Sequence, residues 1–167
     1  MKNITLLGID PGYDRLGWCV LHISGQKNQI IASGCIETNK SDTIFARYLA
    51  IDTELSTMIK TYHPTECGIE TLFFTKNAKT VMKVSEVRGV VISCLLRRGI
   101  EVFDYTPMQI KSAITGNGRA GKPEVEQMIT LLTRCEKLPK LDDEVDAIAT
   151  ALCHGVSRAV RVRTRSL

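Results

Sequence analysis

Three extended segments lie within the first 37 residues, ahead of any helical pattern, and no other feature limits the possible folds as strongly. Apolar and β-branched residues are concentrated at 4–9, 17–23 and 29–37, and turn-forming residues such as Pro11 and Gly25 separate these segments. Connections this short join antiparallel neighbours in a sheet. We therefore expect the chain to begin with antiparallel strands.

Helical and extended segments alternate after this point. Apolar spacing predicts helices over 42–62, 77–98, 106–116, 123–135 and 142–158, and strands over 66–70 and 100–105. Ser41 or Asp42 is placed to cap the first of these helices. Because helices cross over between the later strands, the order predicts an α/β fold (α+β mixed sheet), with a five-stranded mixed sheet flanked by helices.

The 167 residues have about the length of one domain, and we expect a single domain over 1–157 followed by a basic, arginine-rich tail over 158–167. The tail is either a disordered solvated end or an additional phosphate-binding arm. No apolar segment approaches the roughly 20 residues of a membrane span, and Asp10 interrupts the first one before a signal-peptide core can form. We expect a soluble, cytoplasmic protein with no membrane partner.

Cysteine and histidine residues show no metal-binding spacing. The 6 cysteines include no Cys-x-x-Cys pair and most have apolar neighbours, which favours buried thiols over zinc ligands or disulfides. The 3 histidines form no His-x-x-x-His pattern, and we expect structural roles for them.

The net charge of +4 conceals an uneven distribution. The formal charge is −2 over 1–74, +6 over 75–122, −4 over 123–157 and +4 over 158–167. Such a pattern is expected where acids form a cation site while bases face an anion, although chance clustering on a solvated surface produces it too.

Two acidic residues end apolar strands. Asp10 follows the apolar segment 6–9, and Glu70 follows Ile69 at the end of 66–70. A carboxylate at the edge of a buried strand loses several kcal/mol of hydration unless it is paired or bound to a metal. The alternatives are a turn-initiating role for Asp10 and a salt bridge for Glu70.

A third acidic group opens the last predicted helix. Asp143 with Asp146, or Asp142 with Asp146, can share one helix face. Acids in a first turn also cap a helix and favour its dipole, but four acids in residues 142–146 exceed that need. If the three groups converge, they form an oxygen site for Mg²⁺ or Mn²⁺, and two such ions can activate water and stabilise the leaving oxygen of a phosphodiester.

Basic and aromatic residues suited to DNA adjoin these acids in the sequence. Lys111 and Lys122 bracket a glycine-rich basic turn that contains Arg119, and a lysine there can reach a phosphate oxygen or the attacking water. Phe73 and Phe74 follow Glu70 closely. One of these rings could stack on a base, although core packing is the better expectation for at least one.

Taken together, the motifs resemble the RuvC-type crossover junction endodeoxyribonucleases. The resemblance covers about 4–154, and its motifs, in chain order, are Gly8 to Gly12 with Gly17; Ile69 and Glu70 with Phe73 and Asn77; Arg88 to Val90; Gly116 to Gly118 with Lys122; and Asp143 with Asp146 and Ala147. Leu16 and Thr71 depart from the family's usual threonine and amide residues at these positions. Neither is a candidate metal ligand, so we expect changed packing or DNA contacts.

The resemblance implies a ribonuclease H-like fold and a homodimeric, Mg²⁺-dependent Holliday junction resolvase, which in bacteria works beside a branch-migration helicase complex. Each subunit would nick one strand of a four-way DNA junction. The implied metal ligands and catalytic carboxylates are Asp10, Glu70, Asp143 and Asp146, with two Mg²⁺ ions per subunit or Mn²⁺ in their place. Lys111 and the catalytic Lys122 would serve the scissile phosphate, Phe73 would wedge or stack at the junction centre, and the helix carrying Arg88 and Gly89 would lie near the dimer interface. Asp143 is preferred to Asp142 because it provides the family's i, i+3 pair.

Other functions remain as alternatives. The segment from Asp10 to Gly17 also resembles the first phosphate loop of actin-like and sugar-kinase-like ATPases, but those folds need two lobes. A junction-binding protein without catalysis would retain carboxylates that repel DNA. A related ribonuclease H-like nuclease acting on RNA or other branched DNA is a closer alternative.

Overall fold

The structure, a computed structural model, describes residues 3–72 and 78–164, and the side chains of 3–72 and 81–161. The secondary structure elements are β1 (Ile4–Asp10), β2 (Arg15–Ser24), β3 (Lys27–Glu37), α1 (Ile44–Tyr62), β4 (Glu66–Glu70), α2 (Ala78–Leu96), β5 (Glu101–Tyr105), α3 (Pro107–Thr115), α4 (Lys122–Thr133) and α5 (Asp142–Thr164). The strands and helices follow one another in the order predicted from the sequence.

The strands form a mixed five-stranded sheet in the order β3-β2-β1-β4-β5. β1 pairs antiparallel with β2, which pairs antiparallel with β3, while β4 lies parallel to both β1 and β5. The predicted mixed sheet and its antiparallel start are confirmed. Because β1 and β4 are parallel neighbours, their carboxyl ends meet at one edge of the sheet.

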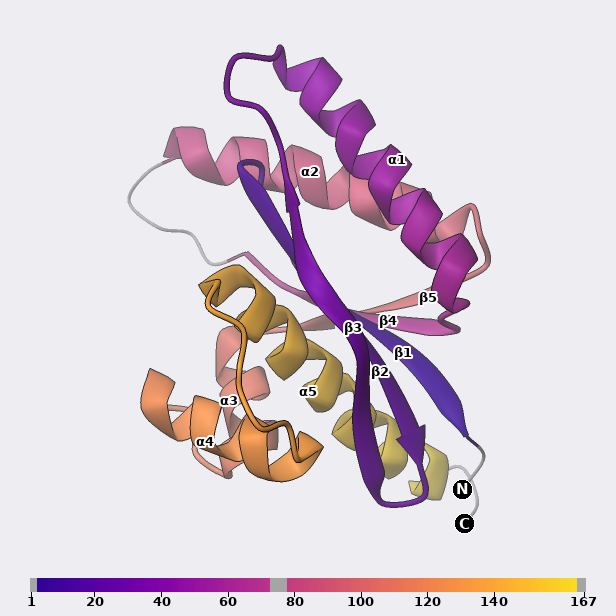
Figure 1. Ribbon diagram of the computed structural model, residues 1–167, viewed down its shortest axis with the longest axis vertical. Helices are drawn as coiled ribbons and strands as arrows, with labels where there is room; N and C mark the ends of the chain where they lie inside the picture. The colour runs from indigo at the N-terminus through magenta and orange to yellow at the C-terminus, as the bar shows by residue number, and fades with distance from the viewer. Residues whose placement is uncertain (1–2, 73–77, 165–167) are drawn as a thin grey trace.

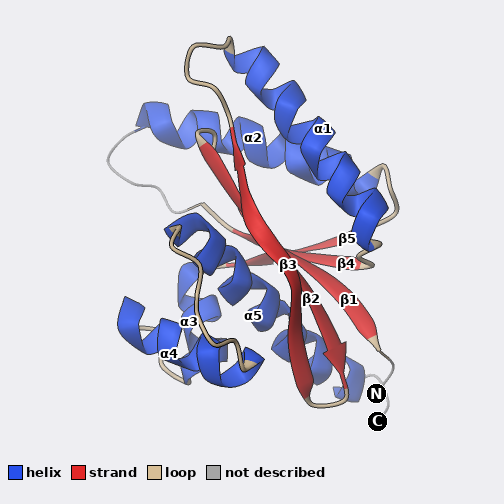
Figure 2. Ribbon diagram, in the orientation of Figure 1, coloured by secondary structure: helices blue, strands red, loops and turns tan. Residues whose placement is uncertain are grey.

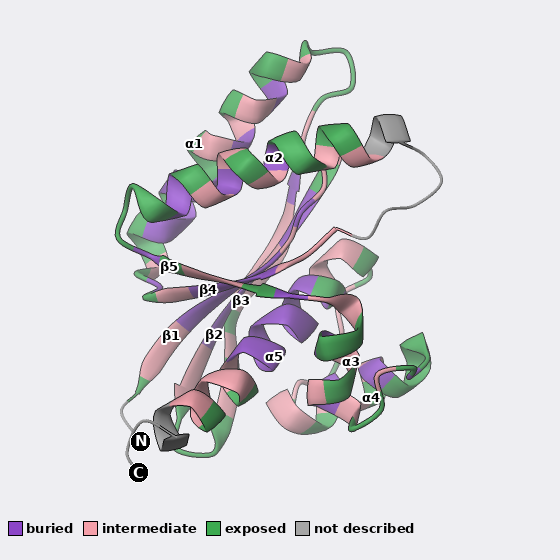
Figure 3. Cartoon of the chain, turned by 180° about the vertical axis from the view of Figure 1, so that it is seen from behind, coloured by how far each residue is buried: buried purple, intermediate pink, exposed green. Residues whose placement is uncertain are grey.

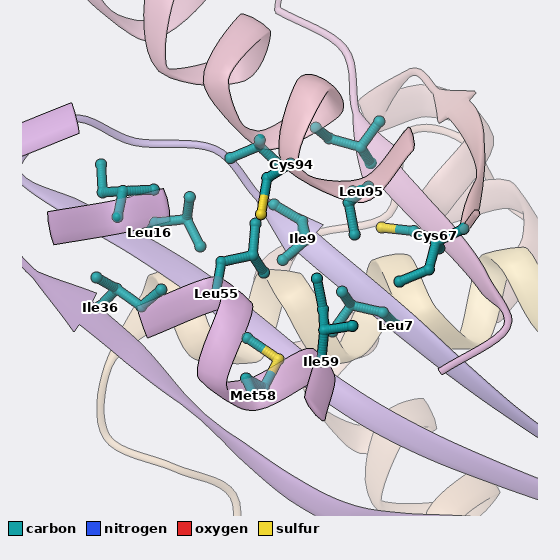
Figure 4. Close-up of a cluster of buried hydrophobic side chains, with 14 of the residues drawn as sticks. Leu7, Ile9, Leu16, Ile36, Leu55, Met58, Ile59, Cys67, Cys94 and Leu95 are labelled. Carbon is teal, nitrogen blue, oxygen red and sulfur yellow. The ribbon is translucent and has the colours of Figure 1, made fainter. Parts of the chain in front are cut away.

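Helices cover both faces of the sheet. Figures 1 and 2 show α1 and α2 on one side of it, and α3, α4 and α5 on the other. One apolar cluster contains Leu7, Ile9 and residues of α1 and α2, and Figure 4 shows several of its side chains gathered between these elements. A second cluster joins β2 and β5 to α3, α4 and α5. Residues 147–154 of α5 are all buried, as Figure 3 shows for the middle of that helix.

Two glycines allow the backbone of α5 to touch the sheet. A Cβ at Gly8 would stand 2.3 Å from the carbonyl oxygen of Ala147, and one at Gly17 would stand 1.8 Å from the carbonyl oxygen of Asp143. Both separations are far below van der Waals contact, so only glycine fits. The first turn of α5 therefore rests directly on β2, opposite the end of β1, where Gly17 pairs with Asp10.

Some local predictions need correction. The side chain that caps α1 is that of Thr43, which accepts from Ala46 N, and not that of Ser41 or Asp42. α5 continues to Thr164 and does not end near Arg158, whose Nε donates to Glu66 Oε1 at 2.7 Å. The ion pair between Arg158 of α5 and Glu66 of β4 thus supports the last turns of the helix, which the spacing of apolar residues does not predict.

The cysteines and histidines behave largely as expected. All 6 cysteines are free, and 4 of them are buried, while Cys35 and Cys135 are partly exposed. His154 is fully buried, and its Nδ1 shares a 2.8 Å hydrogen bond with the Tyr105 hydroxyl. Burial lowers the pKa of His154 to about 4, so this ring is neutral and structural near pH 7.

Within the described parts of the chain, no helix combines the length and apolar character that crossing a membrane requires.

The contact at Gly17 makes a testable prediction. A Gly17→Ala substitution should lower the free energy of unfolding by about 1–3 kcal/mol, because the new methyl group must displace the first turn of α5. A Gly89→Ala substitution in α2 is the matched control, since a Cβ there meets nothing within 4 Å. Alanine should stabilise that helix by up to about 1 kcal/mol. Urea denaturation measures both, and equal stability of the two variants would contradict the close contact.

Candidate active site

Acidic side chains from three elements meet at the carboxyl edge of the sheet. Asp10 ends β1 and Glu70 ends the adjacent parallel strand β4, where Ile9 and Ile69 are paired. Asp143 and Asp146 come from the first turns of α5. This part of the helix can lie directly against β2 because Gly17 has no side chain. The fold therefore brings these acids to the same edge of the sheet.

The electrostatics of the site show how closely these carboxylates interact. The pKa of Asp10 is raised to about 8, mainly by burial and further by the charges of Glu70, Asp146 and Asp143. Burial and the charge of Asp146 raise the pKa of Glu70 to about 7, against the opposing effect of Lys111. Without a cation, the site therefore tends to retain protons near neutral pH.

Asp146 belongs to the same coupled group. The residue is exposed, yet neighbouring protein atoms displace part of its water and raise its pKa. Lys122 and Lys111 oppose this rise, whereas Asp142 and Asp143 add to it. Asp146 is therefore coupled by charge both to Asp10 and Glu70 and to the two lysines.

The acids of the first turns of α5 have separate environments. Asp142 points to solvent and pairs with Lys122 Nζ at 2.5 Å, which lowers its pKa. Glu144 accepts a 2.7 Å hydrogen bond from Ser33 Oγ of β3, which ties the helix start to the sheet. Of the four acids at this helix start, the charges of Asp143 and Asp146 raise the pKa of Asp10. This separation favours Asp143 over Asp142 as the partner of Asp10.

The donor set fits a hard divalent cation. Carboxylate oxygens are the preferred ligands of Mg²⁺ and Mn²⁺, and a cation would relieve the repulsion that raises the pKa values of Asp10 and Glu70. Asp143 Oδ2 is enclosed and lies 2.9 Å from an Arg15 nitrogen, yet no described residue gives it a well-directed hydrogen bond. Across 3–72 and 81–161, no three His, Cys, Asp or Glu side chains already surround a common point.

A pocket of about 290 Å³ adjoins the acids. Its lining includes Glu70, Asp146, Lys111 and Lys122, together with apolar residues of α3, α4 and α5. The capping box of Thr106 and Gln109, followed by Pro107, fixes the start of α3 and so the position of Lys111. Both lysines predicted to serve a phosphate therefore reach the same pocket as two of the carboxylates.

The two remaining predicted DNA-binding residues are Arg119 and Phe73. Arg119 is exposed on the turn before α4 and does not line the pocket. Phe73 lies outside the described residues, so its predicted role at a junction stays a prediction.

Sequence reasoning missed two arginines that organise the site. Arg15 pairs with Asp143. Arg47 of α1 is buried, pairs with Asp14 and donates to the Tyr13 carbonyl at 2.7 Å, which fixes the turn after Asp10. Arg15 lies between Gly12 and Gly17 of the first motif, so its place close to Asp10 in the sequence was a usable signal. Nothing in the sequence of α1 distinguishes Arg47 from an arginine exposed to solvent.

Comparison with known proteins identifies similar sequences along nearly the whole chain. The family model for "Crossover junction endodeoxyribonuclease RuvC" matches residues 6–154. The protein of that name from Petrotoga mobilis is 46% identical over 152 residues, which cover 91% of this chain and 93% of the relative. The one from Pseudothermotoga lettingae is 42% identical over 160 residues, covering 96% and 99%.

The fold of the chain also matches solved structures. The chain matches T. thermophilus RuvC in complex with Holliday junction substrate with a TM-score of 0.90 and 26% identity, covering 95% of this chain and 96% of that chain. The yeast mitochondrial Holliday junction resolvase Ydc2, at 9% identity and a TM-score of 0.65, shares the fold. The ribonuclease H-like architecture expected from the sequence is confirmed by these matches.

The raised pKa values predict an unusual pH dependence. In metal-free protein, folded Asp10 keeps a proton up to about pH 8, whereas the unfolded chain loses it near the ordinary value of 3.8. The folded state then binds more protons, so the free energy of unfolding should fall as pH rises from 5 to 8. Asp10→Asn should flatten this slope, measured by urea denaturation in EDTA. Asp142→Asn is the control, because the pKa of Asp142 is lowered and its loss should leave the slope in place.

Proposed function

Because the chain belongs to the RuvC family of crossover junction endodeoxyribonucleases, we propose that it is a Holliday junction resolvase that nicks four-way DNA junctions by metal-dependent hydrolysis during recombination and repair. One observation carries the proposal: Asp10, Glu70 and Asp146, with Asp143, are electrostatically coupled at one edge of the sheet. The family model for crossover junction endodeoxyribonucleases matches residues 6–154, which include all four of these acids.

The proposed mechanism assigns a task to each group. Asp10, Glu70, Asp143 and Asp146 would hold two Mg²⁺ ions, or Mn²⁺ in their place. The bound cations would supply a nucleophilic hydroxide and stabilise the leaving oxygen of the phosphodiester. Lys111 and Lys122 line the same pocket and would hold the scissile phosphate through charge-assisted hydrogen bonds. Lys122 must leave Asp142 to do so, and because that pair is exposed, the exchange costs little.

The assembly that we propose is a homodimer. Two active sites related by a dyad suit symmetric nicks in two strands. Exposed apolar side chains on α1 and α2, namely Phe45, Leu49 and Met82, are of the kind that a symmetric interface buries. A branch-migration helicase complex as partner and a location in the bacterial cytoplasm complete the proposal. Its domain division stays that of one nuclease domain over 1–157 and a basic segment over 158–167.

Cleavage of synthetic DNA tests the function directly. The full-length chain should nick a four-way junction in Mg²⁺, should leave the matching linear duplex largely intact, and should lose activity in EDTA. Asp10→Asn and Asp146→Asn should each slow cleavage by at least about 100-fold, because each removes several kcal/mol of transition-state stabilisation. Equal cutting of both DNAs, or none of the junction, would refute the resolvase function.

A second experiment separates the two neighbouring acids. Asp143→Asn should abolish cleavage while junction binding persists, whereas Asp142→Asn should reduce the rate only a few-fold through its pair with Lys122. Single-turnover rates and gel-shift binding of both variants provide the comparison. Loss of cleavage in Asp142→Asn alone would place the ligand one residue earlier.

A further inference from the structure

One arginine reaches the group of proposed metal ligands. Arg15 begins β2, shortly after Asp10 in the chain, and one of its guanidinium nitrogens lies 2.9 Å from Asp143 Oδ2. None of the other three proposed ligands has an ion pair among the described residues. Arg15 does not line the pocket that contains Lys111 and Lys122. A third base thus stands beside the acids, and it comes from β2 rather than from α3 or α4.

The pair between Arg15 and Asp143 is a contact of charges that the protein does not lock in place. Asp143 Oδ2 is enclosed, yet it receives no well-directed hydrogen bond from any described residue. The Arg15 side chain is 43% exposed and that of Asp143 is 26% exposed. Ion pairs this open to water contribute little to stability. The guanidinium can therefore leave Asp143 at small cost.

The backbone on both sides of this pair is fixed, so the two side chains are the parts that can move. Arg47, a buried residue of α1, holds the turn before Arg15 by pairing with Asp14. Gly17 lets the carbonyl of Asp143 rest on β2, which fixes the start of α5. A change of partner by Arg15 therefore needs no change of fold.

Arg15 and a divalent cation would compete for the same carboxylate. Besides burial, the charge of Asp143 is among those that raise the pKa of Asp10, so these two acids are close enough to share a cation. A guanidinium and a cation at one carboxylate repel each other, and the double charge of the ion doubles the repulsion. Arg15 at Asp143 therefore weakens cation binding, and a bound cation favours the release of Arg15.

The DNA backbone offers Arg15 a replacement acceptor. A guanidinium can donate two parallel hydrogen bonds to one phosphate, and Arg15 is an exposed residue beside the acids. DNA that takes Arg15 leaves Asp143 free for the cation, and a cation that takes Asp143 leaves Arg15 free for DNA. Each ligand then raises the affinity for the other, as thermodynamic linkage requires.

We propose that Arg15 is a positioning residue that couples DNA binding to cation binding. It pairs with Asp143 in the protein without DNA and moves to a backbone phosphate of the bound junction, which opens Asp143 to the cation. The inference rests on the proposed metal-dependent junction cleavage and adds to it a reason why the site takes up its cations most readily when DNA is bound.

Binding of Mn²⁺ by the full-length chain without DNA tests the competition. Arg15→Gln should bind Mn²⁺ at least about fivefold more tightly than the wild type, which is the order of effect that one unit charge has on a nearby divalent ion. Arg15→Lys keeps the charge, so its affinity should be closer to that of the wild type than to that of Arg15→Gln. Isothermal titration calorimetry at one fixed pH measures all three affinities.

A matched control is available just beyond the end of α2. Arg97 also pairs with an aspartate, Asp52 of α1, at 2.8 Å, and neither residue belongs to the acidic group of the site. Arg97→Gln should therefore bind Mn²⁺ as the wild type does. Melting temperatures of all variants identify any that fail to fold. Arg15→Met, which keeps most of the side chain but not its charge, replaces Arg15→Gln in that case.

Junction binding tests the second half of the inference. The gain in junction affinity on replacing EDTA by Ca²⁺ should be at least about threefold larger for the wild type than for Arg15→Gln, because only the wild type carries the coupling. In Ca²⁺, the salt dependence of the wild type should be steeper by about 0.9, the slope of one phosphate contact. Gel-shift titrations measure both quantities, and gels of the recovered DNA show that it stays intact.

The failures are distinguishable. Unchanged Mn²⁺ affinity in Arg15→Gln would overturn the inference alone, and so would weaker affinity, because Arg15 would then orient Asp143 for the cation instead of competing with it. Equal Ca²⁺ gains in the wild type and Arg15→Gln would overturn it as well. A wild type that binds no Mn²⁺, or that cleaves no junction, would overturn the proposed function and this inference with it.

Discussion

The direct contact between the backbone of α5 and the sheet is the constraint on which the rest of the structure depends. A helix normally stands about 8–10 Å from its packing partner because side chains intervene. Here Gly8 and Gly17 remove those side chains on β1 and β2, so the carbonyls of Ala147 and Asp143 lie where a Cβ would otherwise be. That approach brings the first turns of α5 to the ends of β1 and β4, and every acidic group of the site depends on it.

The same closeness explains the chemistry of the site. Carboxylates that converge from two strands and a helix repel each other, and partial burial removes the water that would screen them. Protons relieve this repulsion in metal-free protein, and divalent cations are the natural alternative. Among the described residues, Arg15 pairs with Asp143, Lys122 pairs with Asp142, and Lys111 lines the pocket beside Glu70. They moderate the charge without filling the site, which leaves room for a cation and a phosphate.

Much of this could be predicted from the sequence because the relevant signals are local. The order of elements, the parallel strands and the acids at strand ends follow from apolar spacing and turn residues near each segment. The sequence predicts Ser41 or Asp42 as the cap of α1, whereas the structure has Thr43. All three side chains can accept a hydrogen bond from the helix start, so only the backbone geometry decides which one does. The sequence does not predict the continuation of α5 past Arg158 either. That turn is supported by the hydrogen bond from Arg158 to Glu66, which lies 92 residues earlier in the chain.

The sequence by itself determined which acids and glycines are candidates for the site, since acids within apolar segments and glycines at fixed spacing are visible without coordinates. Only the tertiary structure decided how they are used. Asp142 and Asp143 are neighbours of identical chemistry, and their difference arises because the helix turns one toward Lys122 and the other toward Arg15 and Asp10. The pairing of Arg88 with Asp104, and the pocket beside it, likewise require α2 to pack against β5. Chemical type is a property of each residue, but charge coupling, burial and unsatisfied donors exist only between residues that folding brings together.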